Sequence, residues 1–206
     1  MTVTQSKHPL VAHLVSRLRE SRLDPLQVRQ TIGDIGRYLL YESLETLTLK
    51  RKRIDTWQGE LEVDAFTESD FVFIPILRAA LPMVEHILPV FPNAMGGFMA
   101  MKRDEETFEG KLYYDRIPDL YGKTVVVCDP MLATGGSLDE ALTVLKEKGG
   151  KDIISLNIIA APTGVEYIKN RHPDVSFFIA SIDEKIEKGF IYPGMGDAGD
   201  RAYNTL

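Results

Sequence analysis

The chain has 206 residues, of which 44% are hydrophobic and 26% are charged, with 16 glycines and 11 prolines. These values lie near the average for globular domains, so they exclude a collagen, a coiled coil and a wholly disordered chain. Thirty acidic residues outnumber 24 basic ones and give a formal net charge of −6. This balance argues against nucleic acid as a partner, because phosphate backbones attract basic surfaces.

The single cysteine and the first residues of the chain predict a cytoplasmic location. Cys128 has no partner for an internal disulfide and lies in an apolar run, which is typical of a reducing compartment. The segment from Met1 to Lys7 is polar and lacks the apolar core of an export signal. The most apolar stretch, Ile153 to Ala161, is too short to cross a bilayer. We therefore expect no membrane partner.

The first third of the chain predicts a long helix followed by a hairpin. Asp24 is a typical helix cap, Pro25 suits the first helical position, and apolar residues at helical spacing extend the pattern to about Glu42. Residues 47–63 alternate around a glycine and predict a hairpin or a short arm. The basic run at residues 50–53 is interpreted as a solvated arm, with an RNA contact as the alternative.

From residue 70 onward, short apolar runs alternate with amphipathic stretches. Such runs suit strands covered by helices on both faces, so the pattern predicts an α/β fold with a parallel sheet of about five strands. The expected strands are Phe71 to Ile76, Gly96 to Met101, Thr124 to Cys128, Ile153 to Ala160 and Phe177 to Ile182. The expected helices are Ala80 to Leu88, Ser137 to Lys148 and Gly164 to Arg171. Ligands of such sheets bind at the carboxyl ends of the strands.

The strongest local signal lies between the third expected strand and its helix. It comprises Asp129, Pro130, Met131, Leu132, Ala133, Thr134, Gly135, Gly136 and Ser137. Small residues let the backbone approach a ligand, and a helix N-terminus presents N–H groups with partial positive charge, so the segment predicts a phosphate site. The alternative is an ordinary strand-to-helix turn. Ser137 and Glu140 have capping-box spacing, which predicts a capped helix start.

Two other phosphate signatures fail on context. Gly194, Gly196 and Gly199 match the dinucleotide pattern, but only seven residues follow, too few for the helix and strand that the pattern needs. The segment Gly122 to Thr124 imitates the end of a P-loop but leads into a strand. We therefore expect neither ATP nor NAD as a ligand. The histidines show no metal-binding spacing, so we expect no metal site made by the protein alone.

Several segments together resemble one family over nearly the whole chain. They are Lys7 to Val11, Pro75 to Ala79, Arg103 with Glu105 to Thr107, Asp129 to Ser137, and Pro193 to Arg201. These segments are similar to the type I phosphoribosyltransferases, and the run Gly196 to Asp200 is typical of their uracil branch. The resemblance implies a single domain over residues 1–206, with a core at about 65–183 and a small hood formed by the N-terminal segment and residues 184–206.

The resemblance also implies a reaction and a site. The reaction is transfer of a phosphoribosyl group from phosphoribosyl pyrophosphate (PRPP) to N1 of uracil, giving UMP and pyrophosphate in pyrimidine salvage. By similarity, the loop up to Ser137 holds the ribose 5′-phosphate, and Asp129 accepts hydrogen bonds from the ribose hydroxyls. Arg78 and Arg103 are implied to bind the pyrophosphate, and Asp197 also faces PRPP. The uracil site is implied at Ile191, Gly196, Asp197 and Ala198. Mg²⁺ is expected to arrive as Mg-PRPP. A GTP effector and a homo-oligomer, a dimer or larger, are further expectations.

Three questions stay open at this level. The family pattern Arg-Ala-Gly-Leu is here Arg78, Ala79, Ala80 and Leu81. If the family glycine needs a positive φ, Ala80 is strained; if it serves only close approach, one methyl group can be absorbed. The polar segment at residues 104–118 predicts either a mobile excursion that closes over substrate or a plain solvated hairpin. The alternatives to a functional enzyme are a regulator that senses uridine nucleotides and binds RNA, and an inactive paralogue.

Overall fold

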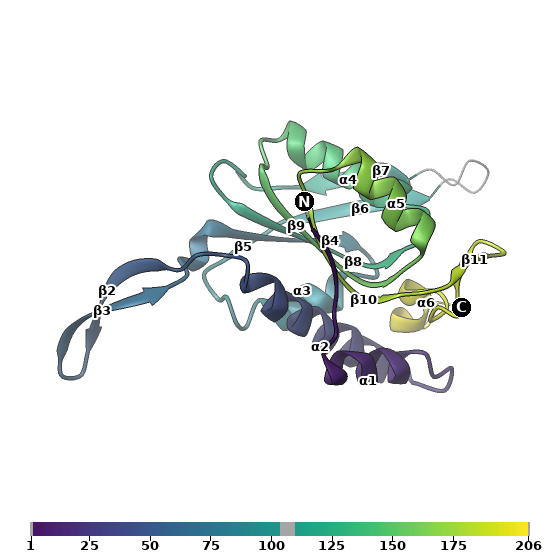
Figure 1. Ribbon diagram of the computed structural model, residues 1–206, viewed down its shortest axis with the longest axis horizontal. Coiled ribbons are helices and arrows are strands. Elements are labelled where there is room, and N and C mark those ends of the chain that lie inside the picture. The colour runs from purple at the N-terminus through teal and green to yellow at the C-terminus, as the bar shows by residue number, and fades with distance from the viewer. Residues whose placement is uncertain (1, 104–109, 206) are drawn as a thin grey trace.

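A mainly parallel sheet separates two layers of helices in the computed structural model, which describes residues 2–103 and 110–205 (Figure 1). The order across the sheet is β1, β10, β9, β8, β4, β6 and β7, and β5 pairs with β4 off this path. All neighbouring strands on the path are parallel except β6 and β7. The strands span β1 (Val3–Gln5), β4 (Phe71–Leu77), β5 (Met95–Gly96), β6 (Phe98–Arg103), β7 (Gly110–Arg116), β8 (Thr124–Leu132), β9 (Asp152–Ala160) and β10 (Ser176–Ile182).

The five expected strands are confirmed, with differences at the edges of the sheet. The run expected at Gly96 to Met101 is divided between β5 and β6, and β8 continues four residues beyond Cys128. The short edge strand β1 and the edge strand β7 were not predicted. Both carry polar residues on an exposed face and lack the continuous apolar run of a buried strand. Because β7 pairs antiparallel with β6, the hairpin alternative describes residues 110–116, whereas residues 104–109 lie outside the described part.

The helices form one layer on each face of the sheet. They span α1 (Pro9–Leu18), α2 (Pro25–Leu44), α3 (Leu81–Ile87), α4 (Gly136–Glu147), α5 (Pro162–Arg171) and α6 (Ala198–Tyr203). One buried core joins α1, α2, α3 and α6 to the face of Phe73, Val126 and Leu156, and the other joins α4 and α5 to the face of Val127 and Phe177. The predicted helices are confirmed. The helix α2 begins as expected, because Asp24 accepts a hydrogen bond from the N–H of Gln27 at 2.8 Å in a capping box.

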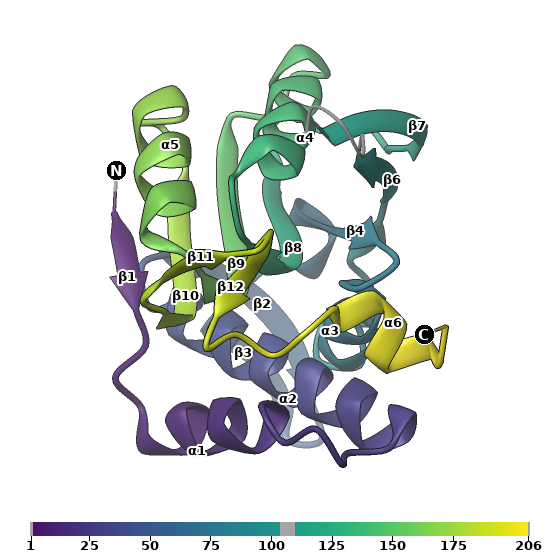
Figure 2. The same ribbon diagram turned by 90° about the vertical axis from the view of Figure 1, so that its right-hand side faces the viewer.

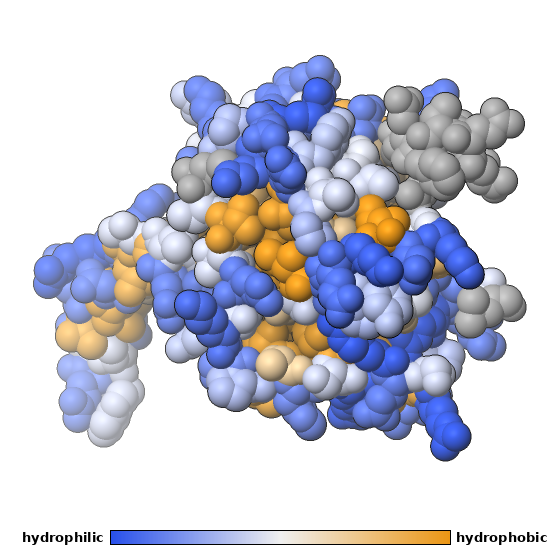
Figure 3. Space-filling model, turned by 45° about the vertical axis from the view of Figure 1, so that its right-hand side comes forward, coloured by the Kyte–Doolittle hydropathy of each residue, from blue (hydrophilic) through white to orange (hydrophobic). Residues whose placement is uncertain are grey.

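A hairpin of β2 (Lys50–Thr56) and β3 (Gly59–Ala65) extends from the body as an arm (Figure 1). The basic run on β2 is paired with acidic residues: Arg51 lies 3.1 Å from Glu62, and Arg53 lies 3.1 Å from Glu60. This pairing supports the interpretation as a solvated arm. The arm mixes hydrophilic with hydrophobic surface, which Figure 3 shows at the left. Among the helices of the described part, none combines the length and the apolar character that a bilayer span requires.

The last part of the chain folds back over the carboxyl ends of the strands (Figure 2). A second hairpin joins β11 (Lys185–Glu187) to β12 (Phe190–Tyr192), and the chain then enters α6. Arg29 of α2 donates a hydrogen bond at 2.6 Å to the carbonyl of Ala202, and Arg201 donates one at 2.7 Å to the carbonyl of Leu18. The C-terminal segment is therefore held by the same helices that cover one face of the sheet.

Candidate active site

A cavity of about 350 Å³ opens at the carboxyl end of β8, beneath the β11–β12 hairpin. Its volume lies within the range typical of small-molecule sites. The cavity is lined by Asp129, Met131, Leu132, Ala133, Thr134, Gly135, Gly136, Ser137, Leu138, Lys188, Gly189, Phe190, Ile191 and Asp197. The structure thus brings most of the segment Asp129 to Ser137 together with two members of the expected uracil site. Pro130 is buried beside the cavity and does not line it.

The start of α4 presents free backbone donors to this cavity. The helix begins at Gly136, and Gly135 precedes it with φ of 93°, a conformation that side chains rarely adopt. No described side chain caps this end. The predicted capping box of Ser137 and Glu140 is therefore wrong, because Ser137 lies inside the first turn. The first N–H groups of α4 remain for an anionic ligand, and the helix dipole adds partial positive charge.

The helix α5 packs very closely against the loop that joins β8 to α4. A Cβ atom at Gly164 would lie 2.1 Å from the carbonyl oxygen of Ala133, so only glycine permits this separation. A Cβ atom at Gly135 would in turn lie 2.8 Å from the ring of Tyr167. Gly164 therefore lets the backbone of α5 approach the backbone of the loop, and Gly135 leaves room for the side chains of α5.

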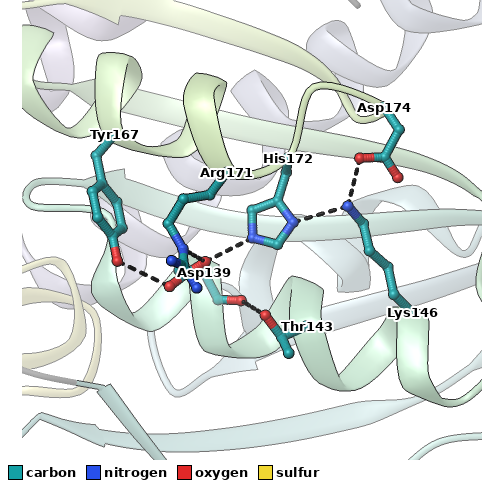
Figure 4. Close-up of polar contacts among 7 residues, drawn as sticks. All are labelled: Asp139, Thr143, Lys146, Tyr167, Arg171, His172 and Asp174. Atoms are coloured by element: carbon teal, nitrogen blue, oxygen red, sulfur yellow. Dashed lines mark hydrogen bonds and ion pairs between the residues drawn. The ribbon is translucent and has the colours of Figure 1, made fainter.

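Polar side chains fix α5 to the first turns of α4 (Figure 4). Asp139 accepts hydrogen bonds from Nε of Arg171 at 2.6 Å, from Nε2 of His172 at 2.8 Å and from the hydroxyl of Tyr167 at 3.0 Å. Burial alone would raise the pKa of Asp139, but these three donors hold it below its usual value. Lys146 lies 2.9 Å from the other ring nitrogen of His172, and burial lowers the pKa of this histidine. Neutral His172 is therefore the form that joins the two helices.

Asp129 lines the cavity and directly follows the continuously buried residues Val125 to Cys128 of β8. One of its carboxylate oxygens accepts a hydrogen bond from the N–H of Met131 at 3.2 Å. Burial raises the pKa of Asp129 to about 7, and this hydrogen bond opposes the shift. The amide of Asn157, itself held by Ser155, donates at 2.9 Å to the carbonyl of Asp129. These contacts hold Asp129 in place, and a ligand that donates hydrogen bonds to its carboxyl group would stabilise the ionised form.

Arg78 follows β4 and faces the C-terminal segment instead of lining the cavity. Its Nη2 lies 3.1 Å from a carboxylate oxygen of Asp200, and its side chain is 56% exposed. A Cβ atom at Gly199 would lie 3.3 Å from Asp197 and 3.8 Å from Arg78, so these two side chains flank the same glycine. Arg103 ends β6, and its side chain lies outside the described part.

Ala80 adopts an ordinary backbone conformation. Its φ is −85° and its ψ is −8°, and its side chain is fully buried in the core. This conformation is open to every L-residue, so the strained alternative for Ala80 is excluded and the methyl group is absorbed by packing.

The expected uracil residues are divided between two places. Ile191 and Asp197 line the cavity, whereas Gly196 lines a second hollow, together with Arg19 and Arg201. Ala198 is buried as the first residue of α6, and Asp197 caps this helix by accepting from the N–H of Asp200 at 2.8 Å.

Among the described residues, no three His, Cys, Asp or Glu side chains gather to hold a metal, and Asp129 and Asp197 are the acidic residues that line the cavity.

An ion pair between Arg19 and Asp183 fixes the turn at Gly194 in the C-terminal segment. Arg19 binds both carboxylate oxygens of Asp183, at 2.7 and 2.6 Å, and also donates at 2.6 Å to the carbonyl of Gly194. Asp183 accepts from the N–H of Gly194 at 2.8 Å. Burial would raise the pKa of Asp183, but the hydrogen bonds from Arg19, Gly194 and Ser181 hold it below its usual value. The buried Asp183 carboxylate and its partly buried partner Arg19 therefore anchor the turn that leads to Asp197.

Comparison with known proteins gives one consistent result. The family model described as uracil phosphoribosyltransferase matches residues 5–205. A uracil phosphoribosyltransferase of Aquifex aeolicus is 41% identical over 202 residues, which cover 98% of this chain and 97% of that protein. The chain belongs to the uracil phosphoribosyltransferase family.

Further relatives agree with this membership. A uracil phosphoribosyltransferase of Wolinella succinogenes is 40% identical over the full length of both chains. The solved structure titled AQ2163 protein from Aquifex aeolicus superposes with a TM-score of 0.95 at 40% identity, covering 98% of each chain. A hypoxanthine-guanine phosphoribosyltransferase of Bacillus anthracis shares the fold, with a TM-score of 0.50 at 14% identity and 82% of each chain covered.

Sequence reasoning missed two parts of this uracil phosphoribosyltransferase family site. The turn residues Lys188 and Gly189 line the cavity, yet a Lys-Gly pair between short strands resembles any surface turn. The pairing of Arg19 with Asp183 joins residues 164 positions apart and has no local pattern. The resemblance itself was the signal for the rest, because Ile191 and Asp197 are unremarkable without it.

Proposed function

We propose that this member of the family transfers the phosphoribosyl group of PRPP to N1 of uracil, giving UMP and pyrophosphate. The observation that carries the proposal is the uncapped start of α4, which opens into the same cavity as Asp129 and the segment at Ile191 and Asp197. The uncapped helix start, the Asp129 carboxyl group and the wall at Ile191 thus border one space, which supports the binding of a phosphate, a sugar and a base together. The proposed enzyme is a pentosyltransferase of pyrimidine salvage.

The sugar phosphate is proposed to bind to the backbone of the loop between β8 and α4. The N–H groups from Thr134 to Ser137 would bind the 5′-phosphate, and Asp129 would accept hydrogen bonds from the ribose hydroxyls. Departure of pyrophosphate places positive charge on the ribose ring, and the Asp129 carboxylate is placed to stabilise it. Burial raises the pKa of Asp129 to about 7, and the hydroxyl donors and developing positive charge of the substrate would lower it again, because they stabilise the ionised form.

The leaving pyrophosphate is proposed to be bound by Arg78 and Arg103. A guanidinium presents several donors in a fixed plane that match phosphate oxygens. Arg78 now pairs with Asp200, but its exposed side chain is free to turn toward a substrate phosphate. Mg²⁺ is proposed to enter as part of the substrate, bound to pyrophosphate oxygens, where it neutralises charge on the leaving group.

Uracil is proposed to be recognised by backbone groups of Ile191, Gly196 and Ala198, with Asp197 directed toward PRPP. Fixed backbone donors and acceptors match the uracil edge and leave unsatisfied partners when cytosine binds. The buried Arg19–Asp183 pair supports this role, because it holds the turn at Gly194 rigidly. We therefore expect discrimination against cytosine to reach at least about 10⁴.

Purified protein incubated with uracil, PRPP and Mg²⁺ tests the proposal by the UMP that forms. We expect UMP formation that requires all three and that falls at least about 100-fold in Asp129→Asn. Absence of UMP together with tight binding to a pyrimidine-operon leader RNA would favour the regulator. Absence of UMP with PRPP still bound would favour the inactive paralogue, a reading weakened by the relaxed backbone of Ala80.

Assembly, an effector and location are further parts of the proposal. We propose a homo-oligomer, a dimer or larger, and the arm supports it because Ile54, Trp57 and Leu61 are exposed there. GTP as an activator and the cytoplasm as the location stay predictions from the resemblance and the composition. Sedimentation of the protein with and without GTP tests the assembly and the effector together.

A further inference from the structure

The turn of the β11–β12 hairpin places one lysine in the wall of the cavity that the start of α4 also lines. Figure 2 shows the hairpin across the carboxyl ends of β8 and β9, with its turn toward α4. Lys188 and Gly189 form this turn between the paired residues Glu187 and Phe190, and both line the cavity. Among the described residues that line it, Lys188 is the single cation, whereas Asp129 and Asp197 are acidic.

The backbone of Lys188 is unusual for its residue type. Its φ is 51° and that of Gly189 is 84°, so both central residues of the turn are left-handed, as in a type I′ turn. Asparagine followed by glycine is the preferred sequence for such a turn, and lysine adopts this conformation rarely. A disfavoured residue in a strained position at a cavity supports a functional role for its side chain.

The ammonium group of Lys188 has no partner within the described part of the chain. Lys185 of the same hairpin, by contrast, lies 3.3 Å from Glu187 and 5.2 Å from the ring centre of Tyr192. An unpaired cation beside two carboxylic acids and an uncapped helix start suits an anionic ligand with several oxygens. It would also reduce the repulsion between such a ligand and the two acids.

We propose that Lys188 binds the phosphate group held at the start of α4, in PRPP and in UMP alike. This inference rests on the proposed function, because that function assigns the phosphate to this place. The hairpin would then serve two parts of the ligand: its turn would hold the phosphate, and β12, which follows the turn, carries Ile191 of the proposed uracil site. A salt-dependent contribution to binding follows, since Lys188 is exposed and screened by ions.

Binding of UMP and of uridine, measured by calorimetry, tests the inference. In Lys188→Asn the dissociation constant for UMP should rise about tenfold at low salt, while that for uridine stays unchanged. Asparagine favours the left-handed backbone, so the thermal midpoint should stay equal or rise. Lys188→Gln should show the same loss of UMP affinity, and Lys185→Gln, the control on the same hairpin, should change it less than twofold.

The outcomes separate this inference from the proposed function. A tenfold loss confined to UMP, with a weaker salt dependence in the variant, supports Lys188 as a phosphate ligand. If both Lys188 variants keep the wild-type preference for UMP over uridine, the inference is wrong and the proposed function stands. If the wild-type protein prefers UMP no more than uridine, the phosphate site itself is wrong and both fail.

Discussion

Replacing Gly164 by alanine tests how closely α5 must approach the loop at residues 133–137, which we propose binds the phosphate. The new Cβ atom would lie 2.1 Å from the carbonyl oxygen of Ala133 and 3.1 Å from that of Leu132. Both neighbours are backbone atoms, so no side chain can turn aside. The first contact must open from 2.1 Å to an ordinary separation near 3.4 Å, that is by about 1.3 Å. The loop and α5 therefore have to separate by about 1 Å.

This displacement sets the expected magnitudes. A misplacement of about 1 Å at a reacting group lowers the rate about 100-fold, so kcat/KM for PRPP should fall by about that factor. The overpacked contact should destabilise the fold by about 1–3 kcal/mol, offset by up to about 1 kcal/mol because alanine favours a helix. We expect the KM for uracil to change much less, since the atoms nearest to the new Cβ atom belong to Ala133 and Leu132 and not to the segment proposed to bind uracil.

Steady-state kinetics with each substrate varied in turn, together with urea unfolding, check this prediction. Gly96→Ala is the matched control, because its Cβ atom would meet no atom within 4 Å and its φ is not positive. It should leave both the kinetics and the stability unchanged. A Gly164→Ala protein that is folded and has a wild-type KM for PRPP would refute the view that this close approach positions the loop.

Three further predictions concern buried charge. The carboxyl group of Asp129 keeps its proton in the folded protein up to a pKa of about 7, so the free energy of unfolding should fall as pH rises from about 4 to 7. Above pH 7, urea unfolding should give Asp129→Asn a free energy of unfolding higher than that of the wild type by at most about 4 kcal/mol. Arg19→Ala leaves the Asp183 charge buried and should cost about 3–5 kcal/mol, with KM for uracil raised more than KM for PRPP in steady-state kinetics. His172 has a lowered pKa, so stability should decline as pH falls below about 6.5, and urea unfolding from pH 7.5 to 5 should show a smaller decline in His172→Gln.

The central part of the fold could be predicted because its signals are local. Apolar runs such as Phe71 to Ile76 are buried on both faces, and the Asp24–Pro25 start of α2 uses a side-chain cap next to it in sequence. The edges could not be predicted in this way. The strand β1 has three residues and pairs with β10, more than 170 positions away, so no pattern within it indicates a strand.

The site shows the same division. The loop after β8 could be located from its small residues, but its capping residue could not be identified. A capping side chain would occupy the N–H groups that a ligand needs, and Gly135 replaces it through a left-handed backbone. The partners that fix the site come from other parts of the chain: Asn157 of β9 holds Asp129, and Asp183, which directly follows β10, holds Gly194. Such contacts depend on the assembled sheet.

A crystal structure of the protein with UMP bound tests the central claim most directly. The account predicts the phosphorus within hydrogen-bonding reach of the N–H groups at the start of α4, with the ribose hydroxyls at Asp129 and the base beside Ile191. UMP bound elsewhere, with these N–H groups turned away from its phosphate, would contradict it.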